Sequence, residues 1–198
     1  VMVGAVDLLI QHEKPREAQL LMLNKIKAAG GRIIRIVRAL RTFARQGEHD
    51  PKGPVSLLTL VEGTLDFCSQ RFAVEGIELD VRVAPELRLF CRELEISQVL
   101  VNLLNNAFDA TLLVRGKKVT LDATVAGDKV EIRVTNPGEI PPEVCERLFQ
   151  PFFTTKEVGK GTGLGLNISR RIAQEHGGTL SFTQGSGQVC FKLTLPLA

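Results

Sequence analysis

The 198-residue sequence has no apolar run approaching the roughly 20 residues that a membrane-spanning helix requires. It also shows no signal peptide. Val1 is not a natural start, so we expect the segment to come from a longer protein. An upstream membrane anchor in that protein is compatible with this sequence. For the segment itself we expect a cytoplasmic location and no membrane contact.

Cysteine is scarce and scattered. Cys68, Cys91, Cys145 and Cys190 lie far apart, and none belongs to a C-x-x-C pair. This spacing argues against both a disulfide framework and a zinc site. We expect four reduced, buried thiols.

No single sign of charge dominates the chain, whose net charge is +3, but the charge is unevenly placed. Residues 1–53 hold ten Lys or Arg against five Asp or Glu (+5), whereas residues 54–198 hold 15 against 17 (−2). The basic excess is mostly Arg32, Arg35, Arg38, Arg41 and Arg45, at helical spacing. These arginines fit a DNA-binding stripe or a solvated helix face, and the lack of interleaved aromatic residues favours the solvated face. We expect no nucleic-acid partner.

The N-terminal part predicts a helical hairpin. Val1–Gln11 has the pattern of a helix end, Lys14-Pro15 of a turn, and Glu17–Gln46 of one long helix. Its apolar residues recur close to heptad spacing: Leu20, Leu23, Ile26, Ile33, Val37, Leu40 and Ala44. This seam is too long for one short partner helix, so we predict an antiparallel hairpin over 1–46 that dimerises into a four-helix bundle. Residues 47–54 are rich in turn formers and predict a linker.

Residues 55–198 mix helical and strand patterns. The predicted helices are Ser56–Arg71, Glu93–Val114, Pro142–Phe149 and Leu164 to His176, and the predicted strands are Ile77–Val83, Leu87–Cys91, Lys118–Val125, Lys129–Thr135, Thr179–Gln184 and Val189–Leu195. This order predicts an α+β fold, a two-layer α/β sandwich with a mixed sheet, preceded by the hairpin.

Three glycines on alternate positions, Gly161, Gly163 and Gly165, lie where a polar loop becomes a helix. Free amides and the helix dipole favour an anion there, and the small residues let phosphate approach the backbone. The stretch is not a P-loop, because Gly159-Lys160-Gly161 has no Ser or Thr after the lysine. It also fits a dinucleotide fingerprint poorly, because the third glycine comes one residue early and no strand precedes it.

The apolar helix Glu93–Val114 carries a polar strip, with Asn102, Asn106 and Asp109 at i, i+4 and i+7. Polar atoms that face a core require a ligand, a metal or ordered water. An Asn amide oxygen is a suitable Mg²⁺ ligand when phosphates complete the shell. The alternative is a solvent-facing helix edge with Asn105 and Asp109 outward.

Five blocks occur in a family-like order: QVLVNLLNNAFDA (98–110), VTNPGEIPPE (134–143), LFQPFFTTK (148–156), GKGTGLGL (159–166) and HGGTLSF (176–182). Together they closely resemble the catalytic ATP-binding (HATPase-type) domain of sensor histidine kinases, whose superfamily includes heat-shock chaperone, gyrase and mismatch-repair ATPases. The blocks cover residues 98–198. The hairpin resembles the dimerisation and phosphotransfer domain of such kinases, which extends the likeness to nearly the whole chain.

The resemblance implies a site for ATP and Mg²⁺. Asn106 is the expected metal ligand, and Phe149, Phe152 and Phe153 are expected to anchor a mobile lid (154–162) in which Lys156 approaches the γ-phosphate. The expected nucleotide-binding residues are Asn102, Asn106, Asp109, Ala110, Asn136, Gly138, Ile140, Phe152, Thr154, Thr155, Lys156, Gly161, Thr162, Gly163, Leu164, Gly165 and Leu166.

The sequence departs from the family pattern at the adenine-contacting aspartate. The stretch Asn136-Pro137-Gly138-Glu139-Ile140 is one residue shorter and offers Asn136, or in another alignment Thr135, in its place. The Asn136 amide oxygen could still accept a hydrogen bond from the adenine amine.

The phosphoacceptor histidine of the family precedes a stretch that Gly4–Leu9 resembles, which places it upstream of this sequence. We do not expect His12, His49 or His176 to take its place, so the fragment alone should bind nucleotide without autophosphorylating.

The function implied is ATP binding and phosphotransfer in the cytoplasmic core of a dimeric sensor histidine kinase. The γ-phosphoryl group would pass to the upstream histidine and then to an aspartate of a response-regulator receiver domain. The alternatives are a non-phosphorylating nucleotide-binding module of the same fold, an ATPase of the chaperone or repair-clamp type and, more distantly, a Rossmann oxidoreductase.

Overall fold

The structure is a computed structural model that describes residues 51–112, 114, 117–157 and 161–198, together with Leu23, Ile26 and Gly30. These last three are helical, within the predicted helix Glu17–Gln46. The rest of the predicted hairpin, the start of the linker, the arginine stripe, His12 and His49 lie outside the described residues. The chain divides into two compact units: a strand domain, Asp50–Phe149 with Gly165–Ala198, and a second unit that contains the segment Gln150–Leu164.

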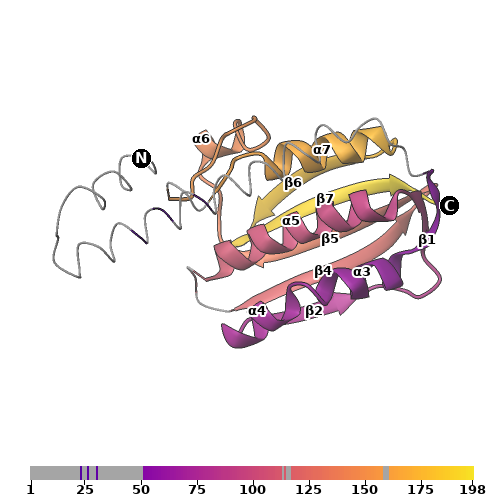
Figure 1. Ribbon diagram of the computed structural model, residues 1–198, viewed down its shortest axis with the longest axis horizontal. Coiled ribbons are helices and arrows are strands. Elements are labelled where there is room, and N and C mark those ends of the chain that lie inside the picture. Colours follow the sequence, from indigo (N-terminus) through magenta and orange to yellow (C-terminus); the bar gives the residue numbers. More distant parts are fainter. Residues whose placement is uncertain are drawn as a thin grey trace. The chain divides into compact units, whose positions relative to one another are not determined.

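A five-stranded mixed sheet underlies the strand domain (Figure 1). Its strands are β2 (Glu78–Arg82), β4 (Lys118–Ala126), β5 (Lys129–Pro137), β6 (Thr179–Gly185) and β7 (Gln188–Pro196). They lie in the order β2-β4-β5-β7-β6, with β2 parallel to β4 and the other pairs antiparallel. Alternate residues of β5 and β7 are buried, as expected of strands with one covered face. The predicted mixed sheet is confirmed.

Helices α3 (Leu57–Leu65), α5 (Glu93–Thr111) and α7 (Gly165–Glu175) cover one face of this sheet (Figure 1). Helix α5 lies against both α3 and α7 and packs on β5. Its buried residues, at helical spacing, are Ile96, Val99, Leu100, Leu103, Leu104, Ala107, Phe108 and Thr111. The sequence therefore correctly predicts an α+β fold with helices on one face of a mixed sheet. Two shorter helices, α4 (Ser69–Val74) and α6 (Pro142–Cys145), complete the described helices of the strand domain.

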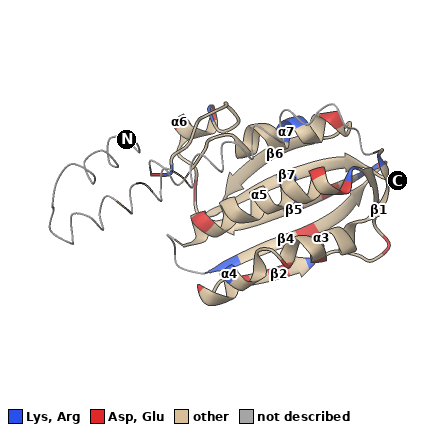
Figure 2. Ribbon diagram, in the orientation of Figure 1, with Lys and Arg blue, Asp and Glu red and all other residues tan. Residues whose placement is uncertain are grey.

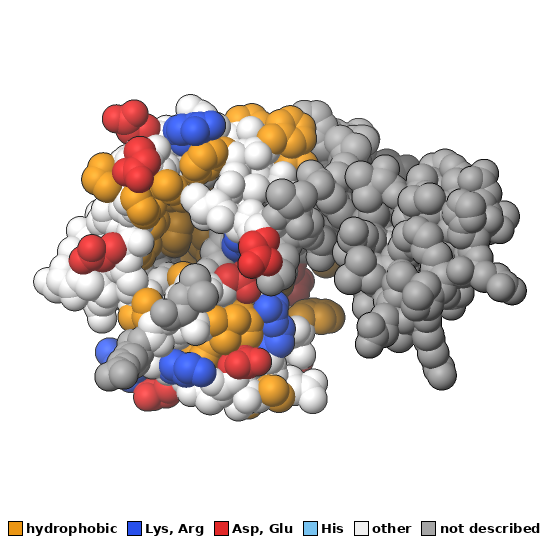
Figure 3. Space-filling model, turned by 90° about the vertical axis from the view of Figure 1, so that its left-hand side faces the viewer, with side chains coloured by type: hydrophobic (Ala, Val, Ile, Leu, Met, Phe, Trp, Pro, Cys, Tyr) orange, Lys and Arg blue, Asp and Glu red, His pale blue; other side chains and the backbone are white. Residues whose placement is uncertain are grey.

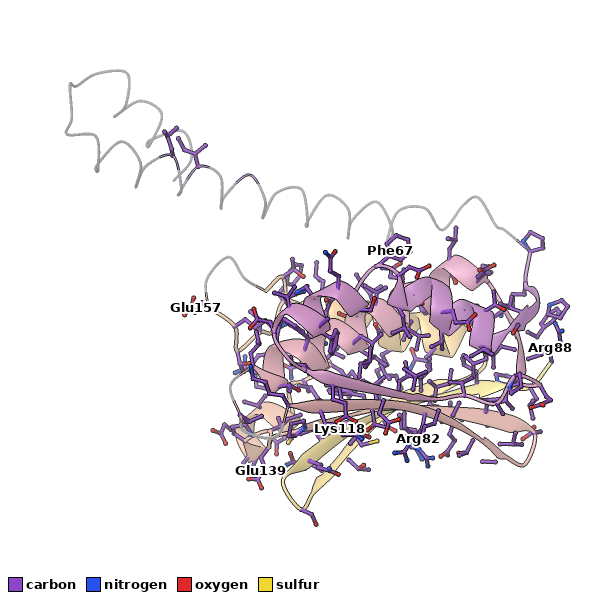
Figure 4. All side chains as sticks on the ribbon, turned by 90° about the horizontal axis from the view of Figure 1, so that it is seen from below. Phe67, Arg82, Arg88, Lys118, Glu139 and Glu157 are labelled. Atoms are coloured by element: carbon purple, nitrogen blue, oxygen red, sulfur yellow. The ribbon has the colours of Figure 1, made fainter. Side chains whose placement is uncertain are left out.

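The opposite face of the sheet is polar. Lys118 and Arg82 project from it, away from the helices (Figure 4). Its cross-strand ion pairs join Lys118 to Glu78 (2.8 Å) and to Asp80 (3.0 Å), Arg133 to Asp122, and Lys192 to Glu131 (3.1 Å). Hydrogen bonds from Arg82 and Lys118 lower the pKa of Asp80. Because these pairs are exposed to solvent and screened by it, they contribute little to stability.

Two local predictions need correction. The predicted helix Ser56–Arg71 is broken, with α3 ending at Leu65 and α4 beginning at Ser69. The break turns Phe72 into the core, where the Phe72 and Phe108 rings pack in a T-shaped arrangement with their centroids 5.2 Å apart. A further strand, β1 (Gly53–Ser56), pairs with β3 (Arg88–Cys91) although its sequence predicted a linker and a helix start. Both features depend on contacts with distant segments, which local periodicity does not contain.

The four cysteines are free, as predicted. Cys68 and Cys91 are buried, whereas Cys145 and Cys190 are half-exposed, so the prediction of four buried thiols is wrong for the second pair. Burial raises the pKa of the Cys91 thiol to about 11, which keeps it protonated and unreactive at neutral pH.

Helix α7 is followed by a buried histidine. A backbone carbonyl only accepts and a backbone amide only donates, so the contacts of His176 fix its tautomer: Nδ1 donates to the Ile172 oxygen (2.8 Å), and Nε2 accepts the Arg92 N–H (3.0 Å). Burial lowers the pKa of His176, although the bond to Ile172 acts in the opposite direction. The ring is therefore neutral at pH 7. At the end of α7 it acts as a neutral hydrogen-bond donor to the Ile172 carbonyl rather than as a cation.

Stability should consequently fall in mild acid. Above the unfolded pKa of about 6.5, His176 is neutral in both states and its stabilising bonds are intact. As the pH falls below this value, the unfolded chain binds a proton before the folded chain does, so the free energy of unfolding decreases. Urea unfolding at a series of pH values should show this loss in the wild type and a shallower profile in His176→Gln. Parallel pH profiles for the two proteins would contradict this assignment.

Candidate functional site

The residues of the polar strip of α5 contact two different helices, α7 and α4. Asn102 faces α7, where its Nδ2 donates to the Ser169 hydroxyl at 3.0 Å. Asp109 faces α4 and forms an ion pair with Arg71 at 3.4 Å. Asn106 lies between them along the helix and is half-buried, as is Ala110. The Asn102 end of the strip therefore belongs to the surface shared by α5 and α7.

Arg71 organises the other end of the strip. Its guanidinium donates to the Asn105 amide oxygen (3.0 Å) and lies 4.0 Å from the centre of the Phe108 ring. A hollow of about 350 Å³ opens here, lined by Gln70, Arg71, Val74, Glu75, Phe108 and Leu112. The end of the domain where α4 and α5 stop is drawn in Figure 3, in which hydrophobic side chains lie among acidic and basic ones. Asn105 and Asp109 thus do face outward, as the alternative interpretation of the strip required, while Asn102 does not.

The N-terminus of α7 lies against Asn102. A side chain at Gly165 would overlap the Asn102 amide, whose Cγ lies 2.9 Å from the position of an added Cβ. Any larger residue at Gly165 would have to displace the Asn102 amide. The first turn of a helix presents free N–H groups and the positive end of its dipole, which together favour an anion. A side-chain amide and an anion-binding helix end thus meet within the strand domain.

Within the segment Gln150–Leu164, residues near its two ends lie close together. Phe152 and Gly163 both have left-handed backbones, with φ of 64° and 66°. They lie so close that a Cβ at Gly163 would be 2.7 Å from the Phe152 Cα and nearer still to its carbonyl carbon. A Cβ at Gly161 would likewise overlap the Thr154 hydroxyl. A non-glycine residue at positive φ is uncommon and often marks a functional segment.

Hydroxyl groups cap the backbone at both ends of this loop. The Thr154 hydroxyl accepts the Lys156 N–H (3.2 Å), and the Thr162 hydroxyl accepts the Leu164 N–H (3.4 Å). The side chains of Thr154 and Thr155 are exposed, and Phe152 is 74% exposed. Of the three predicted anchor residues, Phe152 is thus turned outward within this segment.

Phe149 belongs to the strand domain. Its ring lies 6.3 Å from Phe182, and the Arg170 guanidinium lies 5.0 Å from its centre. The Asn167 side chain donates to the Phe149 carbonyl at 3.1 Å. Phe149 is therefore attached to both β6 and α7 immediately before the segment Gln150–Leu164 begins.

At the end of β5, the two candidates for the adenine contact, Thr135 and Asn136, point to opposite faces of the sheet. Asn136 is 3% exposed and shares the helix-covered face with Val134, whereas Thr135 points to the open face. The Asn136 Nδ2 donates to the Pro137 oxygen at 2.8 Å. Because that carbonyl only accepts, the amide nitrogen must face it, and Oδ1 is presented as an acceptor elsewhere.

The chain after β5 is held against β6 and β7. Gly138, with φ of 126°, donates its N–H to the Gly187 oxygen (2.8 Å). The Gln184 side chain binds both backbone groups of Ile140, accepting its N–H at 2.8 Å and donating to its oxygen at 3.0 Å. Glu139, between them, is exposed (Figure 4). This clamp fixes the backbone of two predicted site residues.

The contacts of Ser169, Gln184 and Arg71 were not predicted from the sequence. Ser169 had a usable signal, because it lies among Ile168, Ile172 and Ala173 on the buried face of α7, where a lone hydroxyl requires a partner. Gln184 and Arg71 had none, because their partners lie more than 30 residues away in the chain. Within residues 51–112, 114, 117–157 and 161–198, no group of three His, Cys, Asp or Glu side chains could hold a metal ion.

Residues 91–198 match the family described as histidine kinase-, DNA gyrase B- and HSP90-like ATPases. The chain is similar to the two-component sensor PprA of Pseudomonas aeruginosa, with 36% identity over 89% of this chain and 20% of that protein. It is also similar to the sensor protein FixL of Bradyrhizobium diazoefficiens, with 36% identity over 82% of this chain and 32% of that protein. The chain thus spans about a fifth to a third of the length of these relatives.

Among solved structures, the nucleotide-free catalytic domain of histidine kinase ThkA aligns with a TM-score of 0.66 and 32% identity, over 73% of this chain and 95% of that one. ThkA in complex with the response regulator TrrA aligns with a TM-score of 0.74 over 100% of this chain and 57% of that one. At 24% identity, this second likeness concerns the fold alone.

Proposed function

The chain belongs to the family of histidine kinase-, DNA gyrase B- and HSP90-like ATPases and contains the ATP-binding catalytic domain of a two-component sensor histidine kinase, and we propose that this domain delivers the γ-phosphoryl group of ATP to a histidine of the full-length kinase. The observation that carries the proposal is the contact of Asn102 with the N-terminus of α7. It joins an amide-bearing helix face to an anion-binding helix end, which are the parts that a metal-bound triphosphate requires.

We assign the phosphates to the N-terminus of α7, with Gly165 and Leu166, and to Asn102. Asn106, one turn beyond Asn102, would hold Mg²⁺ through its amide oxygen. The donor set fits a hard cation, because Mg²⁺ prefers oxygen ligands and usually takes one or two from protein beside phosphate and water. When bound, Mg²⁺ neutralises phosphate charge during transfer. The protein's own contribution is to orient the phosphates and to surround them with fixed dipoles.

The segment Gln150–Leu164 supplies the remaining proposed contacts. Lys156 would place a positive charge on the γ-phosphate, and Thr154 and Thr155 would donate hydroxyl hydrogen bonds to phosphate oxygens. The other proposed nucleotide contacts of this segment are Phe152, Gly161, Thr162, Gly163 and Leu164. Asp109 and Ala110 remain proposed contacts from α5, and Asp109 is also ion-paired with Arg71.

For the adenine base we propose Asn136, with the backbone of Gly138 and Ile140 beside it. Its Oδ1 would accept a hydrogen bond from the adenine amine, and its Nδ2 is already used by the Pro137 carbonyl. Guanine offers an acceptor at the corresponding position, so an oxygen presented there favours adenine.

Asn136→Leu should weaken ATP binding by about tenfold, because a buried amide contact is lost from a site built to make it. Asn136→Asp, which keeps an acceptor, should retain preference for ATP over GTP in competition titrations. Thr135→Val is the matched control, since Thr135 points to the open face and its replacement should leave affinity unchanged. A loss on replacing Thr135, with none on replacing Asn136, would reverse the assignment.

We propose that the phosphoacceptor histidine lies in the full-length protein outside this sequence, and that the phosphoryl group then passes to an aspartate of a response-regulator receiver domain. His176 is unsuited to the role, because both its ring nitrogens are hydrogen-bonded and it is 3% exposed. The likeness to the two-component sensor PprA supports the choice of partner. Dimerisation through residues 1–46 and a cytoplasmic location complete the proposal.

The test is to titrate the chain with a fluorescent ATP analogue, with and without Mg²⁺, and to incubate it with γ-labelled ATP. We expect Mg²⁺-dependent binding without acid-labile label on this chain. Steady hydrolysis of ATP would instead support an ATPase of the chaperone or repair type. Tight binding by the full-length protein without phosphotransfer would favour a non-phosphorylating nucleotide-binding module, which the replacement of the usual aspartate by Asn136 makes the second candidate.

A further inference from the structure

The chain enters the strand domain beside the C-terminal end of α7. Lys52, directly before β1, donates from Nζ to the Glu175 carbonyl at 2.7 Å, across 123 residues of sequence. That carbonyl belongs to the last turn of the helix, where carbonyls have no partner within the helix. A cation there also interacts favourably with the negative end of the helix dipole. The entering strand is thus attached to α7 by a charged hydrogen bond.

The same end of α7 is joined to the start of α5. His176 accepts the N–H of Arg92, the residue before α5, and the Arg92 guanidinium binds Glu95 at 3.0 Å. In Figure 2, acidic and basic residues lie together at this end of the domain, on α5 and α7 and directly before β1. Gly178 then turns closely past β7, where a Cβ would overlap the Thr194 carbonyl. The C-terminal end of α7 therefore has little room to move without breaking these bonds.

The other end of α7 is the proposed phosphate site. Gly165 lies against Asn102, and the Ser169 hydroxyl accepts a hydrogen bond from the Asn102 amide. The eleven residues of α7 span roughly 16 Å, a length over which a helix moves nearly as a rigid rod. A shift at Glu175 is therefore carried to Gly165, which lies next to the Asn102 amide.

We propose that Lys52 is a positioning residue, which acts through α7 to couple the conformation of the chain entering the domain to nucleotide affinity. When the contact with Glu175 is made, α7 is held with its N-terminus against Asn102. When the entering chain draws Lys52 away, α7 gains freedom and the phosphate site loosens. This inference rests on the proposed function, because it takes the phosphates to lie at the N-terminus of α7. Coupling of this kind is reciprocal, so bound nucleotide must also strengthen the Lys52 contact.

The test uses Lys52→Met, which keeps the aliphatic stem and removes the ammonium group. The matched control is Lys117→Met, because Lys117 donates to the Glu75 carbonyl at 2.8 Å after α4, a helix that does not lead to the phosphates. Lys52→Met should weaken binding of a fluorescent ATP analogue with Mg²⁺ by about two- to fivefold. Lys117→Met should leave it unchanged, and Lys52→Arg should restore it.

Hydrogen exchange gives the reciprocal measurement. Nucleotide should slow exchange of amides in Gly53–Ser56 and around His176 in the wild type, and this protection should be lost in Lys52→Met. Unchanged affinity in Lys52→Met, or equal losses in both methionine variants, would overturn the coupling while leaving the proposed function intact. Absence of nucleotide binding by the wild-type chain would overturn the proposed function and the coupling with it.

Discussion

Replacing Asn106 with alanine should lower the affinity for Mg²⁺–ATP by at least about 100-fold, because the variant loses the only protein ligand that we assign to the metal. The loss should depend on Mg²⁺. Nucleotide without metal should bind weakly to the wild type and equally weakly to Asn106→Ala. Calorimetric titration with and without Mg²⁺ measures both quantities.

Asn105→Ala is the matched control. It removes the same side chain from the same helix, one position away, where the amide oxygen accepts a hydrogen bond from Arg71. We expect a small loss of stability and no change in nucleotide affinity. If Asn105→Ala and Asn106→Ala weaken binding equally, the effect comes from the helix and the metal assignment is wrong.

Gly163→Ala should lower nucleotide affinity by roughly 30-fold or more while the strand domain keeps its stability. An alanine at φ of 66° costs about 1 kcal/mol, and its Cβ would also overlap the Phe152 backbone, which has no means of yielding as a flexible side chain would. The segment Gln150–Leu164 must therefore adopt another conformation, and the contacts that we propose for it would be lost.

Gly127→Ala is the control that separates the backbone strain of an alanine at positive φ from the steric overlap with Phe152. Gly127 has nearly the same φ, 65°, but its Cβ would meet nothing within 4 Å. It should cost about 1 kcal/mol of unfolding free energy and leave nucleotide binding intact. Thermal melting together with titration decides the matter: a Gly163→Ala protein that binds as tightly as the wild type would show that the Phe152–Gly163 contact is dispensable.

Local patterns in the sequence predicted much of the fold. The alternation in Lys129–Thr135 placed β5, and the apolar spacing of α5 identified both its buried face and its polar strip. The order of five short motifs identified the family, because several motifs in a fixed order are far more specific than any one of them. The same alternation could have chosen Asn136 over Thr135, since Asn136 has the parity of the buried Val134.

The remainder could not be predicted, because it depends on pairs of residues that are distant in the chain. Strand β1 exists through its pairing with β3, and Pro54 and Gly53 within it suggested only a turn. Lys52 looked like a linker residue until its partner on α7 was known. The break between α3 and α4 likewise depends on the packing of Phe72 into the core, which involves residues distant in the chain.

The amide of Asn136 has a consequence for acid conditions. A carboxylate that recognises a base is lost as an acceptor once it is protonated, whereas an amide carries no titrating proton and keeps its geometry. The Pro137 carbonyl additionally prevents the amide from rotating end for end, because rotation would set two oxygens against each other. Discrimination between purines in this protein should therefore persist through acidification, and any decline in binding at low pH should be traced to the phosphates or to loosening near His176.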